Sequence, residues 1–147
     1  MMNDYLFLDI DGVLNNTNYH ESESSLSYPL SAFCPENVKS FNSLMEEIPN
    51  VKVVISSSWR TDSNLQSIFD KVGLNVKIYG ITSFMLGCDR SKEVEAYLFG
   101  KTYSSYCILD DVNFFNEEQQ PHLCLIDENK GFLESDIERV KAILKSN

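Results

Sequence analysis

Two aspartates separated by one residue are the clearest chemical signal in the sequence. Asp9 and Asp11 directly follow the apolar run from Tyr5 to Leu8, which has the length and composition of a buried strand. Both side chains point away from the intervening Ile10, so both can act on one substrate atom. One carboxylate can accept a phosphoryl group covalently, while the other exchanges a proton with the leaving group and with water. Asp9 is therefore predicted as the nucleophile and Asp11 as the acid/base.

Polar residues also follow two later apolar runs, where they can join this pair. The residues in question are Ser56, Ser57, Ser58, Trp59 and Arg60 after residues 51–55, and Asp110 and Asp111 after residues 106–109. Ligands of open α/β sheets bind beyond the carboxyl ends of the strands. Clustered carboxylates are stable together only beside a cation, and Mg²⁺ is the usual partner of carboxylates and a phosphate. Asp9, Asp11 and Asp110 are predicted to bind Mg²⁺.

Other residues near these strand ends have the chemistry to hold a phosphate. Gly12 permits the turn that brings the main chain close to a phosphoryl group. The Ser56 hydroxyl can donate to the phosphoryl oxygens, and a cation, either Arg90 or Lys92, can balance the charge that develops during transfer.

Ser57 and Arg60 are predicted to bind substrate at the same edge of the sheet, although each can instead have a purely structural role. Ser57 can instead belong to a hydrogen-bonded turn. Trp59 and Arg60 can instead pack over the edge of the sheet, with Arg60 paired to a carboxylate.

The elements that position these residues alternate short apolar runs with segments of helical period. Strands are predicted at residues 5–8, 51–55, 76–79, 106–109 and 123–126. Helices are predicted at 35–48, about 62–72, about 91–99 and 135–144, and Ser135 and Glu138 are spaced as a capping box for the last of them. This order predicts an α/β fold, a three-layer Rossmann-like parallel sheet of about five strands with helices on both faces and minimal or no cap.

Length and composition bound the remaining expectations. The 147 residues predict a single domain over 1–147, with residues 12–34 inserted as a loop or flap. The formal net charge of -10 argues against a broad nucleic-acid-binding face. The sequence has no apolar run of ~20 residues and no CxxC pair among its four cysteines, which favours a cytoplasmic protein without membrane association. No stable protein partner is inferred.

With these residues in place, the sequence resembles the haloacid dehalogenase (HAD) superfamily of phosphatases. LDIDGVLN is similar to the first motif of that superfamily, VVISSSWR to the second and ILDD to the fourth. The resemblance implies that Asp9 is both nucleophile and metal ligand, that Asp11 is the acid/base and that Ser56 binds phosphate. It also implies that Asp110 binds the metal and that Asp111 is an auxiliary ligand. The third motif is a basic residue at a helix start, for which Arg90 is favoured and Lys92 is the reserve.

The segments ISSSWR, GIT at 80–82, RSKEV and KGFL are most similar to the small capless branch named for Swiss-army-knife RNA repair proteins. This resemblance implies removal of phosphate from nucleic-acid ends, as in the phosphatase half of polynucleotide kinase-phosphatases. We therefore expect a Mg²⁺-dependent phosphatase that forms an aspartyl-phosphate on a phosphorylated substrate, which can be the 3' or 5' end of DNA or RNA. Alternatives are a phosphatase of phosphoproteins or small metabolites, a receiver-like domain, and a catalytically degenerate phosphate-binding module.

Overall fold

The computed structural model describes residues 2–145 and contains one five-stranded, entirely parallel sheet. The strands are β1 (Asn3–Leu8), β2 (Lys52–Ile55), β3 (Ile78–Ile81), β4 (Tyr103–Asp110) and β5 (Leu123–Leu125), in the order β3-β2-β1-β4-β5. β3 starts later than expected because the Gln66 side chain bonds Val76 O and Ile78 N at 2.8 Å each. The predicted fold class is confirmed.

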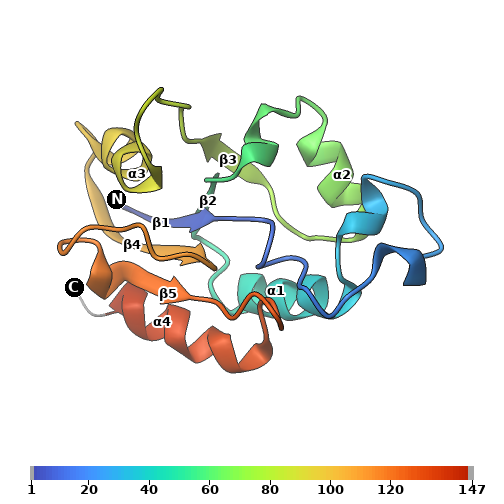
Figure 1. Cartoon of the computed structure of the whole chain (residues 1–147). Coiled ribbons are helices and arrows are strands. Elements are labelled where there is room, and N and C mark those ends of the chain that lie inside the picture. Colours follow the sequence, from blue (N-terminus) through green and yellow to red (C-terminus); the bar gives the residue numbers. More distant parts are fainter. Residues whose placement is uncertain (1, 146–147) are drawn as a thin grey trace.

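In the described part of the chain, four α-helices cover the two faces of the sheet. They are α1 (Pro35–Glu47), α2 (Leu65–Val72), α3 (Arg90–Leu98) and α4 (Ile137–Lys145). The side chains of β1 alternate between the two faces. Leu6 and Leu8 share a core with α1, α2 and α4, whereas Tyr5 and Phe7 pack with α3. In Figure 1, α1 and α4 lie below the strands and α3 lies above them, so the sheet is the middle of three layers.

The last helix starts differently from the prediction. Residues Glu134–Asp136 form a short 3-10 turn, and α4 begins only at Ile137. The Asp136 carboxylate accepts a hydrogen bond from the Leu133 N–H at 2.9 Å. The predicted capping box of Ser135 and Glu138 is therefore wrong, because the side-chain acceptor at this helix start is the Asp136 carboxylate.

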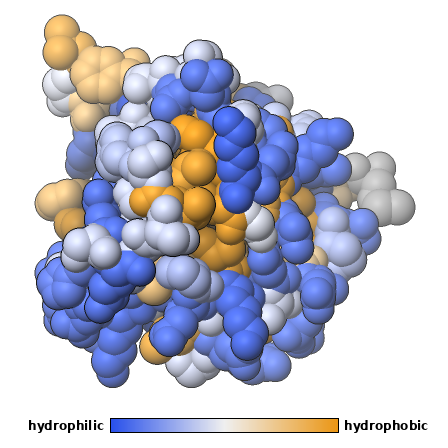
Figure 2. Space-filling view, turned by 90° about the vertical axis from the view of Figure 1, so that its right-hand side faces the viewer, coloured by the Kyte–Doolittle hydropathy of each residue, from blue (hydrophilic) through white to orange (hydrophobic). Residues whose placement is uncertain are grey.

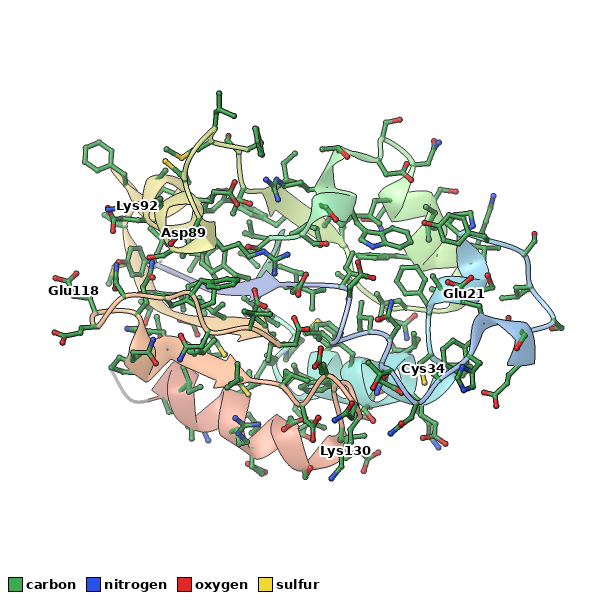
Figure 3. All side chains as sticks on the ribbon, viewed as in Figure 1. Glu21, Cys34, Asp89, Lys92, Glu118 and Lys130 are labelled. Carbon is green, nitrogen blue, oxygen red and sulfur yellow. The ribbon has the colours of Figure 1, made fainter. Side chains whose placement is uncertain are left out.

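The long segment 12–34 is irregular, with two short 3-10 turns, and it is tied to the body of the protein. Phe33 is buried, and its ring centroid lies 5.3 Å from that of Trp59 and 6.1 Å from that of Phe69. In Figure 3, Glu21 lies near the opposite end of the molecule from Asp89, which precedes α3. The outer turn of the segment is thus remote from α3, and its role as a flap stays a prediction.

The surface that carries this segment is largely hydrophilic. Figure 2, which looks from the right-hand side of Figure 1, shows an apolar area in the middle of this face with hydrophilic side chains around it. Within the segment, Leu26 and Tyr28 are 47% and 67% exposed. Among the described residues, no helix combines the length and the apolar composition that a membrane span requires.

Candidate active site

Acidic residues from the ends of β1 and β4 meet at one point. β1 lies between β2 and β4, so the chain leaves three neighbouring strands at Asp9, Ser56 and Asp110. The order of the strands also reverses here, which is where open α/β sheets bind ligands. Carboxylate oxygens of Asp9, Asp110 and Asp111 all lie within 4.8 Å of one another.

Arg90, the first residue of α3, contacts two of these three carboxylates. Its Nη1 atom lies 2.6 Å from Asp110 Oδ2 and 3.0 Å from Asp9 Oδ2. The start of the helix is fixed by Asp89, whose side chain accepts a hydrogen bond from the Lys92 N–H at 3.2 Å. Burial acts to lower the pKa of Arg90, but the carboxylates of Asp9 and Asp110 raise it above its ordinary value. Arg90 therefore stays charged beside the predicted nucleophile.

The clustered carboxylates carry more charge than Arg90 can balance. Asp9 and Asp110 are only 2% and 1% exposed, and Asp111 is half-buried. Burial, followed by repulsion from Asp110, raises the pKa of Asp9 to about 8, and burial also raises the pKa of Asp110. Ionised, three carboxylates and one guanidinium leave a formal charge of about -2 (-3 + 1). The geometry and the charge fit one divalent cation bound by oxygen.

Asp11 lies outside this cluster and has two hydrogen-bond donors of its own. Asn15 Nδ2 donates to its Oδ1 at 3.0 Å, and Trp59 Nε1 donates to its Oδ2 at 3.2 Å. Asn15 Oδ1 in turn accepts from the Gly12 N–H at 2.9 Å. The Asp11 residue is exposed and lines the same cleft as Asp9. Its carboxylate thus lines the cleft but does not join the three-carboxylate cluster, and its roles as acid/base and as metal ligand stay predictions.

Gly12 shapes the turn after β1 and makes room for Asp111. Its φ of +84° lies in the left-handed region, which favours glycine. A Cβ atom at this position would overlap the Asp111 carboxylate. Glycine is therefore required twice, once for the backbone angle and once for the space.

The three serines after β2 have different environments. Ser56 is 1% exposed, and its hydroxyl has no hydrogen-bond partner within residues 2–145. An unpaired buried hydroxyl costs free energy, and a phosphoryl oxygen would supply the missing acceptor. Ser57 Oγ accepts from the Trp59 N–H at 3.2 Å and so caps the 3-10 turn Ser58–Thr61. Ser58, in contrast, lines the cleft.

Arg60 forms a buried ion pair with Glu93 of α3. Arg60 Nη2 lies 3.0 Å from Glu93 Oε2, and the two side chains are 8% and 5% exposed. Arg60 Nη1 also donates to Ser57 O at 2.9 Å, and Glu93 Oε2 also accepts from the Met85 N–H at 3.3 Å. The pair joins the turn after β2 to the helix that carries Arg90. The Arg60 guanidinium is thus engaged by protein groups, although its side chain lines the cleft.

Lys92, the other predicted cation, lies away from the cluster. Its side chain is 60% exposed, and its Nζ atom is 4.0 Å from Glu95 Oε1 one helical turn further along. Figure 3 shows Lys92 on the outer side of α3. Of the two candidates, only Arg90 reaches the predicted nucleophile.

The site opens into a cleft of about 680 Å³. It is lined by Asp9, Asp11, Ser58, Arg60, Thr61, Phe84, Cys88, Asp89, Arg90, Glu93, Asp111, Val112 and Phe114. These residues come from the turn after β1, the turn after β2, the segment before and within α3, and the segment after β4. The sheet thus brings four distant parts of the sequence to one wall around Asp9.

A family model described as the HAD domain in Swiss Army Knife RNA repair proteins matches residues 5–137. The chain belongs to this HAD family. The match extends from β1 to the start of α4 and includes every residue that lines the cleft. No curated protein and no solved structure matches the chain significantly.

Membership of this family supports a HAD-type phosphatase in general. HAD phosphatases generally use Mg²⁺, and Asp9, Asp110 and Asp111 provide the oxygen ligands that such a cation prefers. The residues predicted for the first and fourth motifs include all three carboxylates of this cluster. The residues predicted for the second and third motifs, Ser56 and Arg90, lie at the neighbouring strand end and beside the cluster.

Mg²⁺ binding to this HAD domain should depend on pH, because Asp9 must lose a proton to ligate a cation. The folded-state pKa of about 8 lies above the ordinary 3.8. Protonation of Asp9 therefore favours the folded state. This contribution to the free energy of unfolding is fully present below pH ~4 and is lost as the pH rises toward 8. We expect the Kd for Mg²⁺, measured by calorimetry, to tighten by up to about tenfold per unit between about pH 6 and 8. An Asp11→Asn control should keep this dependence. A pH-independent Kd would show that Asp9 is already ionised at pH 6 or that it does not bind the cation, and an unchanged Kd in Asp9→Asn would exclude it as a ligand.

Several residues that shape the site were not singled out from the sequence. Asn15 orients Asp11 from four positions further along the chain, and Glu93 shares a face of α3 with Arg90, three positions away. These spacings are signals that could have identified both. Gln119 is buried and exchanges hydrogen bonds with Ser91 at 2.7 and 3.0 Å, which ties the start of α3 to the segment after β4. No local pattern distinguishes Gln119 from its polar neighbours.

Proposed function

We propose that this chain is a Mg²⁺-dependent phosphomonoesterase that forms an aspartyl-phosphate on Asp9. The observation that carries the proposal is the position of Asp9 at one wall of an open cleft, between Arg90 and the carboxylates of Asp110 and Asp111. Asp11 and Ser56 leave the neighbouring turns with an exposed carboxylate and an unpaired hydroxyl. These residues support the proposal because they have the chemistry of a nucleophile, a proton carrier and a phosphate-binding group.

In the first half of the reaction, an Asp9 carboxylate oxygen attacks the phosphorus atom. The phosphorus–oxygen bond to the leaving group breaks, and Asp11 donates a proton to the departing oxygen. Arg90 and the Ser56 hydroxyl stabilise the negative charge that develops on the phosphoryl oxygens. Mg²⁺, held by Asp9, Asp110 and Asp111, would add positive charge beside the same oxygens.

In the second half, Asp11 removes a proton from a water molecule, and the water oxygen attacks the phosphorus. The bond between the phosphorus and Asp9 breaks, which releases inorganic phosphate and restores the carboxylate. The Trp59 and Asn15 donors keep the Asp11 carboxylate facing the cleft through both halves. One carboxylate can therefore act first as an acid and then as a base.

We assign the end of a DNA or RNA strand as the substrate class. Two observations support this assignment: the family description refers to RNA repair proteins, and the cleft is open, with no large folded lid in the sequence between its walls. A strand end can enter such a cleft without being engulfed. The net charge of -10 disfavours extended contact with a polyanion but permits end-specific binding, which needs few phosphate contacts.

The test is release of phosphate with Mg²⁺ or with a chelator present. The substrates are acetyl phosphate, 3'- and 5'-phosphorylated oligonucleotides, a phosphopeptide and a sugar phosphate. We expect Mg²⁺-dependent turnover, with the highest kcat/KM for an oligonucleotide end. Higher kcat/KM for the peptide or the sugar phosphate would reassign the substrate to a phosphoprotein or a small metabolite. No turnover of any substrate despite Mg²⁺ binding would favour a degenerate binding module.

A further inference from the structure

Two exposed phenylalanines line the cleft beside the catalytic groups. Phe84 is 70% exposed and precedes α3, whereas Phe114 is 60% exposed and follows the Asp110-Asp111 pair. Neither ring stacks on another aromatic ring within residues 2–145. Large apolar side chains left in water next to a reaction site mark a place where a ligand binds.

The backbone on both sides of the cleft is held in place, although the rings are exposed. Next to Phe84, the Met85 N–H donates to the buried Glu93 carboxylate at 3.3 Å. Next to Phe114, the Gln120 side chain donates to Phe115 O at 2.8 Å, and Asn113 Oδ1 accepts from the Phe115 N–H at 3.2 Å. Rings on a fixed backbone lose little conformational entropy on binding, which favours stacking contacts.

The charges of the cleft exclude recognition through many phosphates. Its lining holds five acidic residues, namely Asp9, Asp11, Asp89, Glu93 and Asp111, and two basic ones, Arg60 and Arg90. Both arginines are already paired, Arg60 with Glu93 and Arg90 with Asp9 and Asp110. Among the described lining residues, no other cation is present to bind a second phosphate of a strand. Affinity beyond the transferred phosphate must therefore come from uncharged contacts.

The depth of the groups identifies the kind of ring. Asp9 is almost fully buried, whereas Phe84 and Phe114 are exposed at the mouth of the cleft. In an aryl phosphate such as phosphotyrosine, the ring is bonded directly to the phosphate oxygen and would lie among the acidic side chains near Asp9. In a nucleotide, a sugar separates the base from the phosphate, so the base reaches the mouth. The rings thus match a nucleobase.

We propose that Phe84 and Phe114 form a stacking site for the base of the terminal nucleotide, which makes the substrate a single-stranded end. Every base has a π-face, so this site binds ends of any sequence. A base paired within a duplex is stacked on its neighbours and is not free to enter. The inference rests on the proposed function, because it needs the phosphate of that nucleotide to reach Asp9.

The experiment compares the kcat/KM for a phosphorylated single-stranded oligonucleotide with that for the same strand carrying an abasic terminal nucleotide. Acetyl phosphate, which has no ring, is the reference substrate. Removal of the base should lower the kcat/KM of the parent protein by about five- to a hundredfold. In the double variant Phe84→Ala/Phe114→Ala, the ratio of oligonucleotide to acetyl phosphate kcat/KM should fall by a similar factor. The kcat/KM of this variant for the abasic strand should equal that of the parent protein. Phe99→Ala, which removes a ring that is 88% exposed but outside the cleft, should keep the parental ratio.

Equal turnover of the normal and abasic ends by the parent protein, beside active hydrolysis of both, would overturn the stacking site but leave the proposed function intact. Discrimination retained in the double variant would do the same. Dependence on the two rings for a phosphotyrosine peptide but not for oligonucleotides would replace the nucleobase by an aryl leaving group. No Mg²⁺-dependent hydrolysis of acetyl phosphate or of any strand would overturn the proposed function and the stacking site together.

Discussion

Replacing Asp9 by asparagine should reduce Mg²⁺-dependent phosphate release at least about a thousandfold, because an amide cannot attack phosphorus to form an acyl phosphate. The fold should survive. Without a cation, the buried Asp9 carboxyl has its pKa raised to about 8 and is held neutral below that pH. The contribution of Asp9 protonation to the free energy of unfolding is lost as the pH rises toward 8, whereas asparagine cannot ionise. We therefore expect Asp9→Asn to have a Tm at least equal to that of the parent above about pH 8.

The measurements are single-turnover phosphate release and thermal unfolding at several pH values, both with and without Mg²⁺. Asp127→Asn is a matched control, since Asp127 is exposed and lies outside the cleft, and its carboxylate accepts only from the Asn129 N–H among residues 2–145. This control should keep parental activity. Unchanged turnover in Asp9→Asn would exclude Asp9 as the nucleophile. A large decrease in Tm would show that Asp9 affects turnover by stabilising the fold.

Arg60→Met should lower the free energy of unfolding by about 3–5 kcal/mol, because it leaves the Glu93 carboxylate buried without its partner. The side chains of the pair are 8% and 5% exposed, and the pair joins the turn after β2 to α3. A second substitution, Glu93→Met, should restore most of the loss, since it removes the unpaired charge. Urea unfolding of the parent, the two single variants and the double variant measures this coupling.

Lys92→Met provides the contrast on the same helix. Lys92 and Glu95 are 60% and 57% exposed and 4.0 Å apart, a geometry that contributes at most about 0.5 kcal/mol. If Arg60→Met cost no more than Lys92→Met, the buried pair would not be holding the two walls of the cleft together. If the double variant were as unstable as the single one, the loss would come from packing rather than from charge.

Most of the fold and much of the candidate site could be predicted because their signals are local. The five strands are short apolar runs, and each polar side chain at their ends follows its run directly in the sequence. Parallel pairing then brings Asp9, Ser56 and Asp110 together without further information. The predicted role of Arg90 also depended on a local feature, namely a basic residue at a helix start.

The parts that could not be predicted depend on contacts between distant segments. Arg60 and Glu93 are separated by 33 positions, and nothing near Arg60 shows that its partner is a buried carboxylate rather than a substrate. Trp59 and Asp11 are separated by 48 positions, so the alternative of simple packing stayed open for the indole until its donor was placed. The start of α4 was misplaced because two acidic residues near a helix N-terminus compete as caps.

Trp59 is the only tryptophan of the chain, and its indole N–H donates to the Asp11 carboxylate while its ring packs on Phe33. The tryptophan fluorescence of the protein therefore originates from one side chain, which contacts both the turn after β1 and the 12–34 segment. Protonation of Asp11, binding of a phosphate or movement of that segment would each alter the surroundings of this single tryptophan. The chain thus carries a built-in optical reporter, and binding can be followed in real time without any attached dye.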